Sequence, residues 1–385
     1  MADYKAAQDD FDAQIAQVTL RIEHLENERT NLRRCRNVVA PISQIPPELL
    51  LKIFSLCNIA LGDDELRYIT NRGHISSQRP ATEEWRLRDA YDKLRYPNVL
   101  RVYHVNHNWR QLVAGSPHLW TRIQVQSKTR PEIVSFMRDK AGAHPIELEY
   151  VGGPYWATDD AHEPDPKFLP TIQDILRASS QNIKSIAIYS SQSVPQQLLV
   201  RIVEGADRLE SLIISLGERS YYSMPPIPVN TRELSAVVIP GLRRLSLEGL
   251  MCPWKSSLLT SSPHLTDVTL RRTEPSSPQG VADLLDFLRR LPKIECLRFR
   301  LLRPHSQPVN EVFFLGKSDL SRATPLFRLQ ELSIYSESPS LLSAILSAIT
   351  IPKFIPSLSL LSGPRPRARA ISTHDRLHDR IRRAH

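Results

Sequence analysis

Few residues of this 385-residue chain have the types and spacing that metal or catalytic chemistry requires. His374 and His378 lie four residues apart, the helical spacing of two zinc ligands, but Asp375 stands where a zinc protease carries glutamate. Their neighbours are arginine-rich. A second group, Asp159 to Asp165 with His162, fits a solvated acidic loop better than a metal site, because nothing in it fixes a geometry. We therefore expect no metal-binding residues.

Motifs of nucleophilic, nucleotide and redox chemistry are missing as well. The chain has no glycine-rich phosphate loop and no Gly-x-Ser-x-Gly turn. Its four cysteines, at 35, 57, 252 and 296, show no paired spacing, which is typical of reduced thiols in an intracellular protein. We expect no enzyme, no cofactor, no signal segment and no membrane span, and hence a cytoplasmic or nuclear location.

The net charge of +9 raises the question of nucleic acid. From Arg365 to His385 there are seven arginines and two aspartates, which amounts to +5 and leaves +4 for all other residues. We interpret residues 364–385 as a basic disordered tail. A solvated tail is favoured over one that contacts nucleic acid or acts as an import signal, so nucleic acid is not an expected partner.

Two short amphipathic segments near the N-terminus carry the most specific pattern. Pro46 and Pro47 suit the start of a helix, since their φ angles are preset and they lack the N–H that a first turn leaves unpaired. The apolar stripe that follows consists of Leu49, Leu50, Ile53, Phe54 and Cys57. A second stripe consists of Val105, Trp109, Leu112 and Val113, and Gly115, Ser116 and Pro117 end it before Leu119 and Trp120. Neither stripe can bury itself alone.

In this order the two segments resemble the F-box family. The family pattern opens a helix with leucine or isoleucine, proline, any residue, glutamate and leucine, continues with a valine and tryptophan helix, and ends on proline, leucine and tryptophan. The matching positions here are Ile45, Pro46, Glu48, Leu49, Ile53, Phe54, Val105, Trp109, Pro117, Leu119 and Trp120. Two departures stand out: Asn106 replaces a usual cysteine, and a polar insertion occupies about 58–99. Long insertions cost little closure entropy.

The resemblance implies a function and a partner. It implies a substrate-recognition adaptor of an SCF-type cullin ubiquitin ligase, which binds a Skp-family adaptor and through it a cullin, while the C-terminal repeats bind an unknown protein substrate. The adaptor-binding residues it implies are Ile45, Pro46, Leu49, Leu50, Ile53, Phe54, Val105, Trp109, Leu112, Pro117, Leu119 and Trp120. The alternative is a non-catalytic interaction scaffold that uses its coiled coil and repeats and has no link to ubiquitination.

A heptad seam precedes these segments. Apolar residues recur at alternating spacings of four and three; they are Phe11, Ile15, Val18, Ile22, Leu25 and Leu32. Arg29 stands at the one position of this repeat that lacks an apolar residue. The pattern predicts a helix over 1–36 that either forms a short coiled coil with a partner or packs on its own chain. Both possibilities remain open from the sequence.

After Trp120 the triplet apolar-x-x-apolar-x-apolar recurs. The six better copies are Ile183/Ile186/Ile188, Leu209/Leu212/Ile214, Leu242/Leu245/Leu247, Leu265/Val268/Leu270, Ile294/Leu297/Phe299 and Leu329/Leu332/Ile334, and a weaker one is Ile355/Leu358/Leu360. Helix-like runs at 171–177, 196–203, 281–290 and 340–346 separate some of them, and Ile123/Val125 and Ile146/Leu148 suggest leading strands. In each triplet the middle residue, such as Val268, should be buried and its neighbour Thr269 exposed.

The triplets resemble leucine-rich repeats, although the asparagine that usually follows the strand is missing. We therefore expect an α+β or α/β fold: a coiled-coil-like helix at 1–36, a small all-helical F-box-like domain at 41–122 with the insertion at 58–99, an irregular leucine-rich-repeat-like α/β solenoid at 123–363, and the tail at 364–385. The alternative for 123–363 is an unrelated α/β domain with parallel strands.

Overall fold

The structure is a computed structural model and describes residues 2–57, 98–126, 129–151, 177, 181–190, 208–216, 238–248, 256–271, 278–291, 293–301, 324–336, 339–352 and 354–362. The chain divides into two compact units. The first, here the helical unit, holds residues 1–60, 96–121 and 136–144. The second, here the sheet unit, holds residues 61–95, 122–135 and 145–385.

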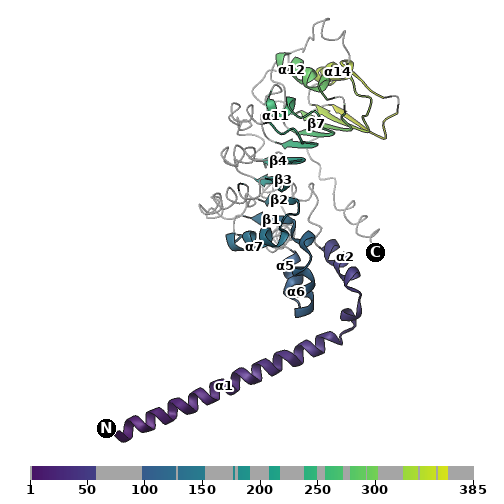
Figure 1. Ribbon diagram of the computed structural model, residues 1–385. Coiled ribbons are helices and arrows are strands. Elements are labelled where there is room, and N and C mark those ends of the chain that lie inside the picture. Colours follow the sequence, from purple (N-terminus) through teal and green to yellow (C-terminus); the bar gives the residue numbers. More distant parts are fainter. Residues whose placement is uncertain are drawn as a thin grey trace, which may run out of the picture. The chain divides into compact units, whose positions relative to one another are not determined.

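The helical unit begins with one long helix and continues with short ones (Figure 1). Its elements are α1 (Ala2–Val38), the 3-10 turn η1 (Pro41–Gln44), α2 (Pro47–Cys57), α5 (Asn98–Tyr103), α6 (His107–Ala114) and the 3-10 turn η3 (Pro117–Trp120), followed by the second half of α7 (Pro131–Ala141). Prolines stand first in η1, α2, η3 and α7, where a missing N–H costs nothing. No described helix has the length and apolar character needed to cross a bilayer.

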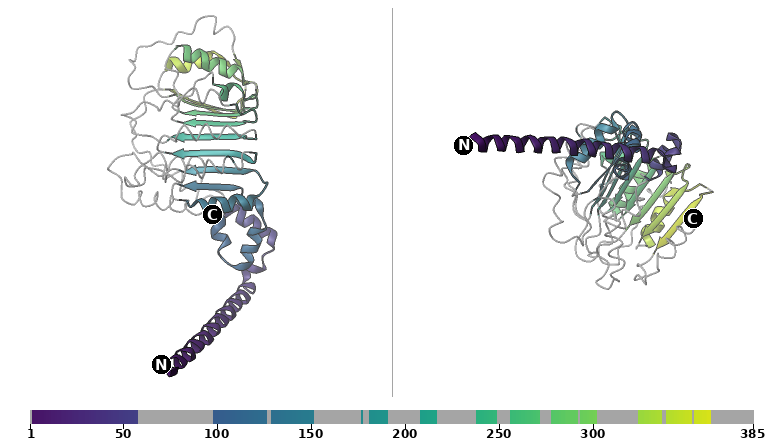
Figure 2. Two further views of the ribbon diagram at one scale, coloured as in Figure 1. Left: turned by 60° about the vertical axis from the view of Figure 1, so that its left-hand side comes forward. Right: turned by 90° about the horizontal axis from the view of Figure 1, so that it is seen from below.

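The sheet unit is built on one nine-stranded sheet. Its strands, in spatial order, are β1 (Arg122–Gln126), β2 (Ile146–Val151), β3 (Ile183–Ser190), β4 (Ser211–Leu216), β5 (Arg244–Glu248), β6 (Asp267–Arg271), β7 (Cys296–Leu301), β9 (Glu331–Ser336) and β11 (Ser357–Ser362). All neighbours are parallel and follow chain order, as the stacked arrows of Figure 2 show. Because crossovers between parallel neighbours are right-handed, the described parts of successive connections are expected on one face of the sheet.

Some of the connections contain described elements. These are α7 between β1 and β2, α11 (Ser257–Thr260) between β5 and β6, α12 (Pro278–Arg289) between β6 and β7, α14 (Pro339–Ser347) between β9 and β11, and a two-stranded parallel sheet of β8 (Thr324–Pro325) and β10 (Ile349–Thr350). The helices predicted at 281–290 and 340–346 are thus confirmed. Leu284, Leu288, Leu341 and Ile345 bury the apolar faces of α12 and α14.

One face of the sheet carries a continuous apolar ladder. The middle residues of the triplets pair in register as Ile186, Leu212, Leu245, Val268, Leu297 and Leu332. The third residues do the same as Ile188, Ile214, Leu247, Leu270, Phe299 and Ile334, and all twelve are buried. The strands predicted at the triplets, and at Ile123/Val125 and Ile146/Leu148, are therefore confirmed. At the edge strand β11 the ladder reaches the surface, since Leu358 and Leu360 are exposed.

A repeated hydrogen bond explains the spacing of the triplet. The carbonyl of Glu210 accepts from the N–H groups of both Arg243 and Arg244, at 2.8 and 2.9 Å. The carbonyl of Arg243 in turn accepts from Thr266 and Asp267, at 2.8 and 3.0 Å. The pattern recurs twice more. The Thr266 carbonyl accepts from the N–H groups of residues 295 and 296, and the Glu295 carbonyl accepts from those of residues 330 and 331. At β5, β6, β7 and β9 the two residues between the first and second apolar positions thus hold the strand to the previous one.

The structure corrects the expected fold class. The described residues form an α/β fold around one nine-stranded parallel sheet, not a small all-helical F-box domain at 41–122 followed by an irregular leucine-rich-repeat-like solenoid at 123–363. The short helices do not close a domain of their own, because their unit also takes in α1 and residues 136–144 of the β1–β2 crossover. The triplet pattern does not distinguish a leucine-rich-repeat solenoid from another parallel sheet, because any buried strand of a parallel sheet satisfies it.

A second correction concerns Thr269. We expected this side chain to be exposed, but only 5% of its surface is exposed, and Ser246 of β5 and Ser215 of β4 are similarly buried on the same face. Alternation along a strand predicts which face a residue occupies but not whether that face is covered. The insertion, the acidic cluster, the runs at 171–177 and 196–203, the positions of the missing asparagines and the tail lie outside the described residues, apart from 98–99 of the insertion and the isolated residue 177.

The two faces of β9 allow a matched test of the ladder. Leu332→Asp should destabilise the sheet unit by about 3 kcal/mol or more, because it places an unpaired carboxylate among buried leucines. Ser333→Asp changes the next residue, which is half-buried on the polar face opposite Arg298, and should change the unfolding free energy by about 1 kcal/mol or less. Urea denaturation of both variants compares them; equal effects would contradict the register.

Candidate functional site

Helix α2 has one buried and one exposed apolar side. Leu50 and Phe54 point inward and are buried. Leu49, Ile53 and Leu56 lie on the other side and are 52%, 43% and 59% exposed. Their spacing of four and three residues places them in one row along the helix. A large apolar row left at the surface of a short helix is the usual mark of a surface that binds something.

This row forms one wall of a shallow groove in the helical unit. The groove has a volume of about 550 Å³ and is lined by Pro41, Gln44, Ile45, Pro46, Leu49, Lys52, Ile53 and Leu56. Its second wall is η1, which Ser43 ties to the end of α1 by donating its hydroxyl proton to the carbonyl of Asn37 at 2.6 Å. Lys52 is the charged residue among the lining residues, so the groove suits an apolar ligand surface with a negative group near one side.

Trp109 of α6 supports α2 from behind. Its ring lies 4.8 Å from that of Phe54, centroid to centroid, with an interplanar angle of 56°. The Trp109 indole nitrogen is buried and, within the part of the chain that the structure describes, has no hydrogen-bond partner. A buried unpaired N–H is destabilising, so the ring is retained here for its packing. Its truncation would disturb the fold of α2 before it affected any bound partner.

Trp120 closes the helical unit. Its indole N–H donates to the carbonyl of Val113 at 2.8 Å, in a fully buried position. Its ring packs edge-on against Tyr103 at 5.5 Å and Phe136 at 5.4 Å, and those two rings are themselves 5.8 Å apart. Edge-to-face aromatic packing of this kind adds to the free energy of burial. The Trp120 side chain is therefore part of the core.

The twelve residues implied by the resemblance fall into three groups. Ile45, Pro46, Leu49 and Ile53 line the groove. Leu50, Phe54, Leu119 and Trp120 are buried, while Trp109, Leu112 and Pro117 are half-buried. Val105 is exposed but does not line the groove. The structure thus brings four of the twelve together in one groove.

Four groove residues were missed by the sequence reasoning. Leu56 could have been found, because it lies seven residues after Leu49 and so continues the same helical row. Lys52 lies between the apolar positions and gives no signal of its own. Pro41 and Gln44 line the groove because they belong to the 3-10 turn η1, which the sequence pattern did not predict.

Asn106, one of the two departures from the family pattern, has a structural role. It is the N-cap of α6: its side-chain oxygen accepts a hydrogen bond from the Trp109 N–H at 2.9 Å, and its carbonyl accepts from Arg110 at 3.0 Å. A cysteine would be a poor acceptor at this place. The substitution therefore fixes the start of the helix that holds Trp109.

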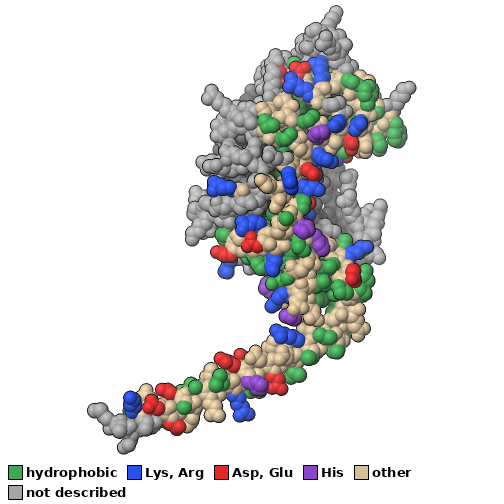
Figure 3. All heavy atoms as spheres, viewed as in Figure 1, with side chains coloured by type: hydrophobic (Ala, Val, Ile, Leu, Met, Phe, Trp, Pro, Cys, Tyr) green, Lys and Arg blue, Asp and Glu red, His purple; other side chains and the backbone are tan. Residues whose placement is uncertain are grey.

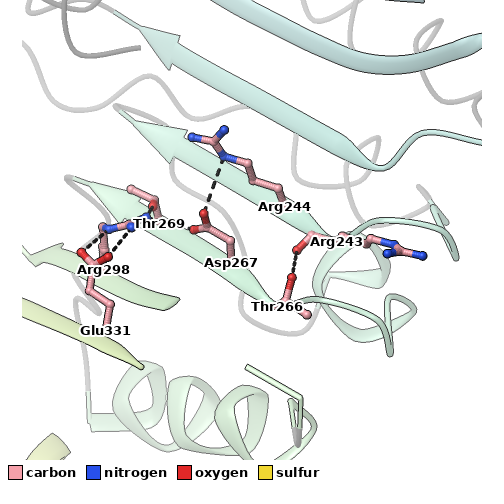
Figure 4. A network of polar contacts seen from close by, with 7 residues as sticks. All are labelled: Arg243, Arg244, Thr266, Asp267, Thr269, Arg298 and Glu331. Carbon is pink, nitrogen blue, oxygen red and sulfur yellow. Dashed lines mark hydrogen bonds and ion pairs between the residues drawn. The ribbon is translucent and has the colours of Figure 1, made fainter. Parts of the chain in front are cut away.

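The sheet unit offers a second, polar site on the face opposite the apolar ladder (Figure 4). The Arg298 guanidinium lies between two carboxylates: its Nη1 is 3.1 Å from Asp267, and its Nε and Nη2 both donate to Glu331, the former at 2.6 Å. Asp267 is also 3.7 Å from the Nε of Arg244. These four side chains, here the charged row, therefore link β5, β6, β7 and β9 across the sheet.

The charges in this row shift one another's titration. The Arg298 guanidinium donates to Glu331 and holds the pKa of that carboxyl below its ordinary value, and the same bond raises the pKa of Arg298. Burial, followed by the charge of Asp267, raises the pKa of the neighbouring Cys296 thiol, which disfavours the nucleophilic thiolate. Among the described residues no cluster of histidine, cysteine and carboxylate side chains could hold a metal ion.

The capping role of Asn106 can be tested against its family counterpart. Asn106→Cys should lower the free energy of unfolding of the helical unit by about 1 kcal/mol, because the α6 N–H loses its acceptor. Asn106→Ser, which keeps an oxygen at the cap, should stay within about 0.5 kcal/mol of the parent. Thermal unfolding followed by tryptophan fluorescence measures both, and a stable Asn106→Cys protein would refute the role.

The pH dependence of the sheet unit tests the Glu331 pair. A carboxyl whose pKa is lowered by folding adds stability above its unfolded pKa and loses it as pH falls through the folded value. Glu331→Gln should therefore be about 1 kcal/mol less stable than the parent at pH 7, and the difference should shrink as the solution is acidified. Glu132→Gln, at an exposed glutamate of α7, is the control. A difference that does not change with pH would count against the ion pair.

No protein-family model matches the sequence, and no curated protein matches it significantly.

Proposed function

We propose that this chain is a substrate-recognition adaptor of an SCF-type cullin ubiquitin ligase. The groove beside α2 binds a Skp-family adaptor, which connects the chain to a cullin. The sheet unit binds the target protein. The location that follows is the cytoplasm or the nucleus, where such ligases work.

The observation that carries this proposal is the exposed row of Leu49, Ile53 and Leu56 beside Ile45 and Pro46. These residues belong to the segment that resembles an F-box, and four of them are implied adaptor contacts. The opposite side of α2 is fixed by Phe54 and Trp109, so the row is held ready for a partner. Preorganisation of this kind lowers the entropy that binding costs.

The proposed role of the protein is to position its target. The chain itself forms and breaks no bonds; it holds a target close to the transferring enzyme and so raises the effective concentration of the target's lysines there. The polar face of the sheet provides fixed charges for that target, since Arg298, Asp267 and Glu331 orient one another and remain partly exposed. The identity of the target does not follow from these residues.

A pair of substitutions on one helix tests the adaptor site. Leu49→Asp should weaken the complex with a purified Skp-family adaptor at least about thirtyfold, because truncation or charging of a central apolar contact often costs 2 kcal/mol or more. Ser55→Asp places the same charge on an exposed α2 position outside the groove and should leave affinity within about threefold. Calorimetric titration measures both affinities, and circular dichroism checks that each variant is folded.

Two outcomes would contradict the proposal. Binding of the Leu49→Asp protein with unchanged affinity would place the adaptor elsewhere. Failure of the parent chain to bind at all would favour the alternative of an interaction scaffold with no link to ubiquitination.

A further inference from the structure

Helix α1 carries an apolar seam that its own chain leaves exposed. The helix spans 37 residues, and every described side chain from Tyr4 to Arg36 is exposed. The six seam residues, each more than half exposed, are Phe11, Ile15, Val18, Ile22, Leu25 and Leu32. Figure 3 shows hydrophobic side chains along α1 between charged ones. Because all six are exposed, the described residues do not support packing of this seam on its own chain.

The seam has the composition of a two-stranded coiled coil. With heptad positions written a to g, Ile15 and Ile22 occupy a, and so does Arg29. The d positions are Phe11, Val18, Leu25 and Leu32. β-branched residues at a with leucine at d favour parallel dimers over trimers and tetramers. A single polar residue at an a position fixes register and strand number at some cost in stability, and Arg29 is placed to do so.

Charges that flank the seam identify the partner. In a parallel, in-register pair of identical helices, a g residue of one copy faces the e residue five positions later in the other. Arg21 would then face Glu26, and Glu28 would face Arg33. Both contacts are attractive, and symmetry forms each of them twice. The seam thus complements an identical helix.

The antiparallel alternative is unfavourable. The alignment that places Ile22 against Val18 of the second copy brings g positions opposite g positions, and e opposite e. Arg21 would face Arg21, and Glu26 would face Asp12. Like charges at these places are destabilising. The parallel pair does place Arg29 opposite Arg29, but Glu26 of the same helix lies 3.7 Å from each of these guanidinium groups. The flanking charges therefore favour the parallel arrangement.

We propose that α1 pairs with α1 of a second copy of this chain as a parallel, in-register, two-stranded coiled coil. Within each helix Glu26 lies 3.7 Å from the Nη2 of Arg29, which places a counter-charge beside the polar a position. The dimer presents two copies of the α2 groove and of the sheet unit. A partner with two matching sites would be held by avidity. This inference does not depend on what the groove binds.

Charge reversal tests the arrangement on the full-length protein. Glu28→Arg and Arg33→Glu should each raise the dimer dissociation constant by about tenfold, because each converts two attractions into repulsions. The double variant restores both pairs in reversed sense and should return to within about threefold of the parent. Glu23→Arg, a reversal at the outward b position, is the control and should change little. Sedimentation equilibrium measures the constants.

A cross-link tests direction and register separately. In a Cys35→Ser background, Leu25→Cys places a thiol at a d position, where the two copies approach to disulfide distance only if the helices are parallel and in register. Mild oxidation should give a covalent dimer, and the Cys35→Ser protein alone should not. Arg29→Leu should tighten the dimer. A monomeric parent protein, charge variants without rescue, or no cross-link at position 25 would each overturn the proposal.

Discussion

The shared carbonyl at the start of β5, β6, β7 and β9 is the constraint on which this part of the sheet unit depends. One acceptor, such as Arg243, takes two successive N–H donors from the next strand, and this fixes both the spacing and the register of the strand that follows. Buried backbone groups must be paired, so the contact cannot slip by one residue without leaving a donor unpaired. The apolar ladder and the charged row then face opposite sides of the sheet along these strands.

That constraint also explains what could be predicted. The triplets located their strands correctly because burial requires the apolar residues. At β5, β6, β7 and β9 the shared carbonyl also requires the two residues between the first and second apolar positions. The same triplets could not tell a solenoid from another parallel sheet, since both impose the same local requirement. The fold class was therefore wrong although the strand positions were right.

The helical unit shows a different limit. Apolar periodicity identified which residues of α2 and α6 matter, but it could not divide them between partner surface and core. Leu49 and Leu50 are adjacent and equally apolar, yet one lines the groove and the other is buried. The division depends on the packing of Phe54 against Trp109, a contact between segments that the polar insertion separates in the sequence, and on the bond from Trp120 to the Val113 carbonyl. The sequence alone identified Asn106 as a departure from the family pattern. Its role as an N-cap became evident only from the observed start of α6.

The edge strand β11 bears on how the protein behaves in concentrated solution. Its sequence Ser-Leu-Ser-Leu-Leu-Ser contains neither lysine nor proline, and Leu358, Leu360 and Leu361 are exposed. Natural sheets usually protect their last strand with charge, proline or a bulge, because an open row of backbone donors and acceptors is a template for another extended chain. In this molecule the apolar ladder continues to that edge. Self-association and precipitation should therefore begin at β11, and a lysine at Leu360 is the simplest change to raise solubility.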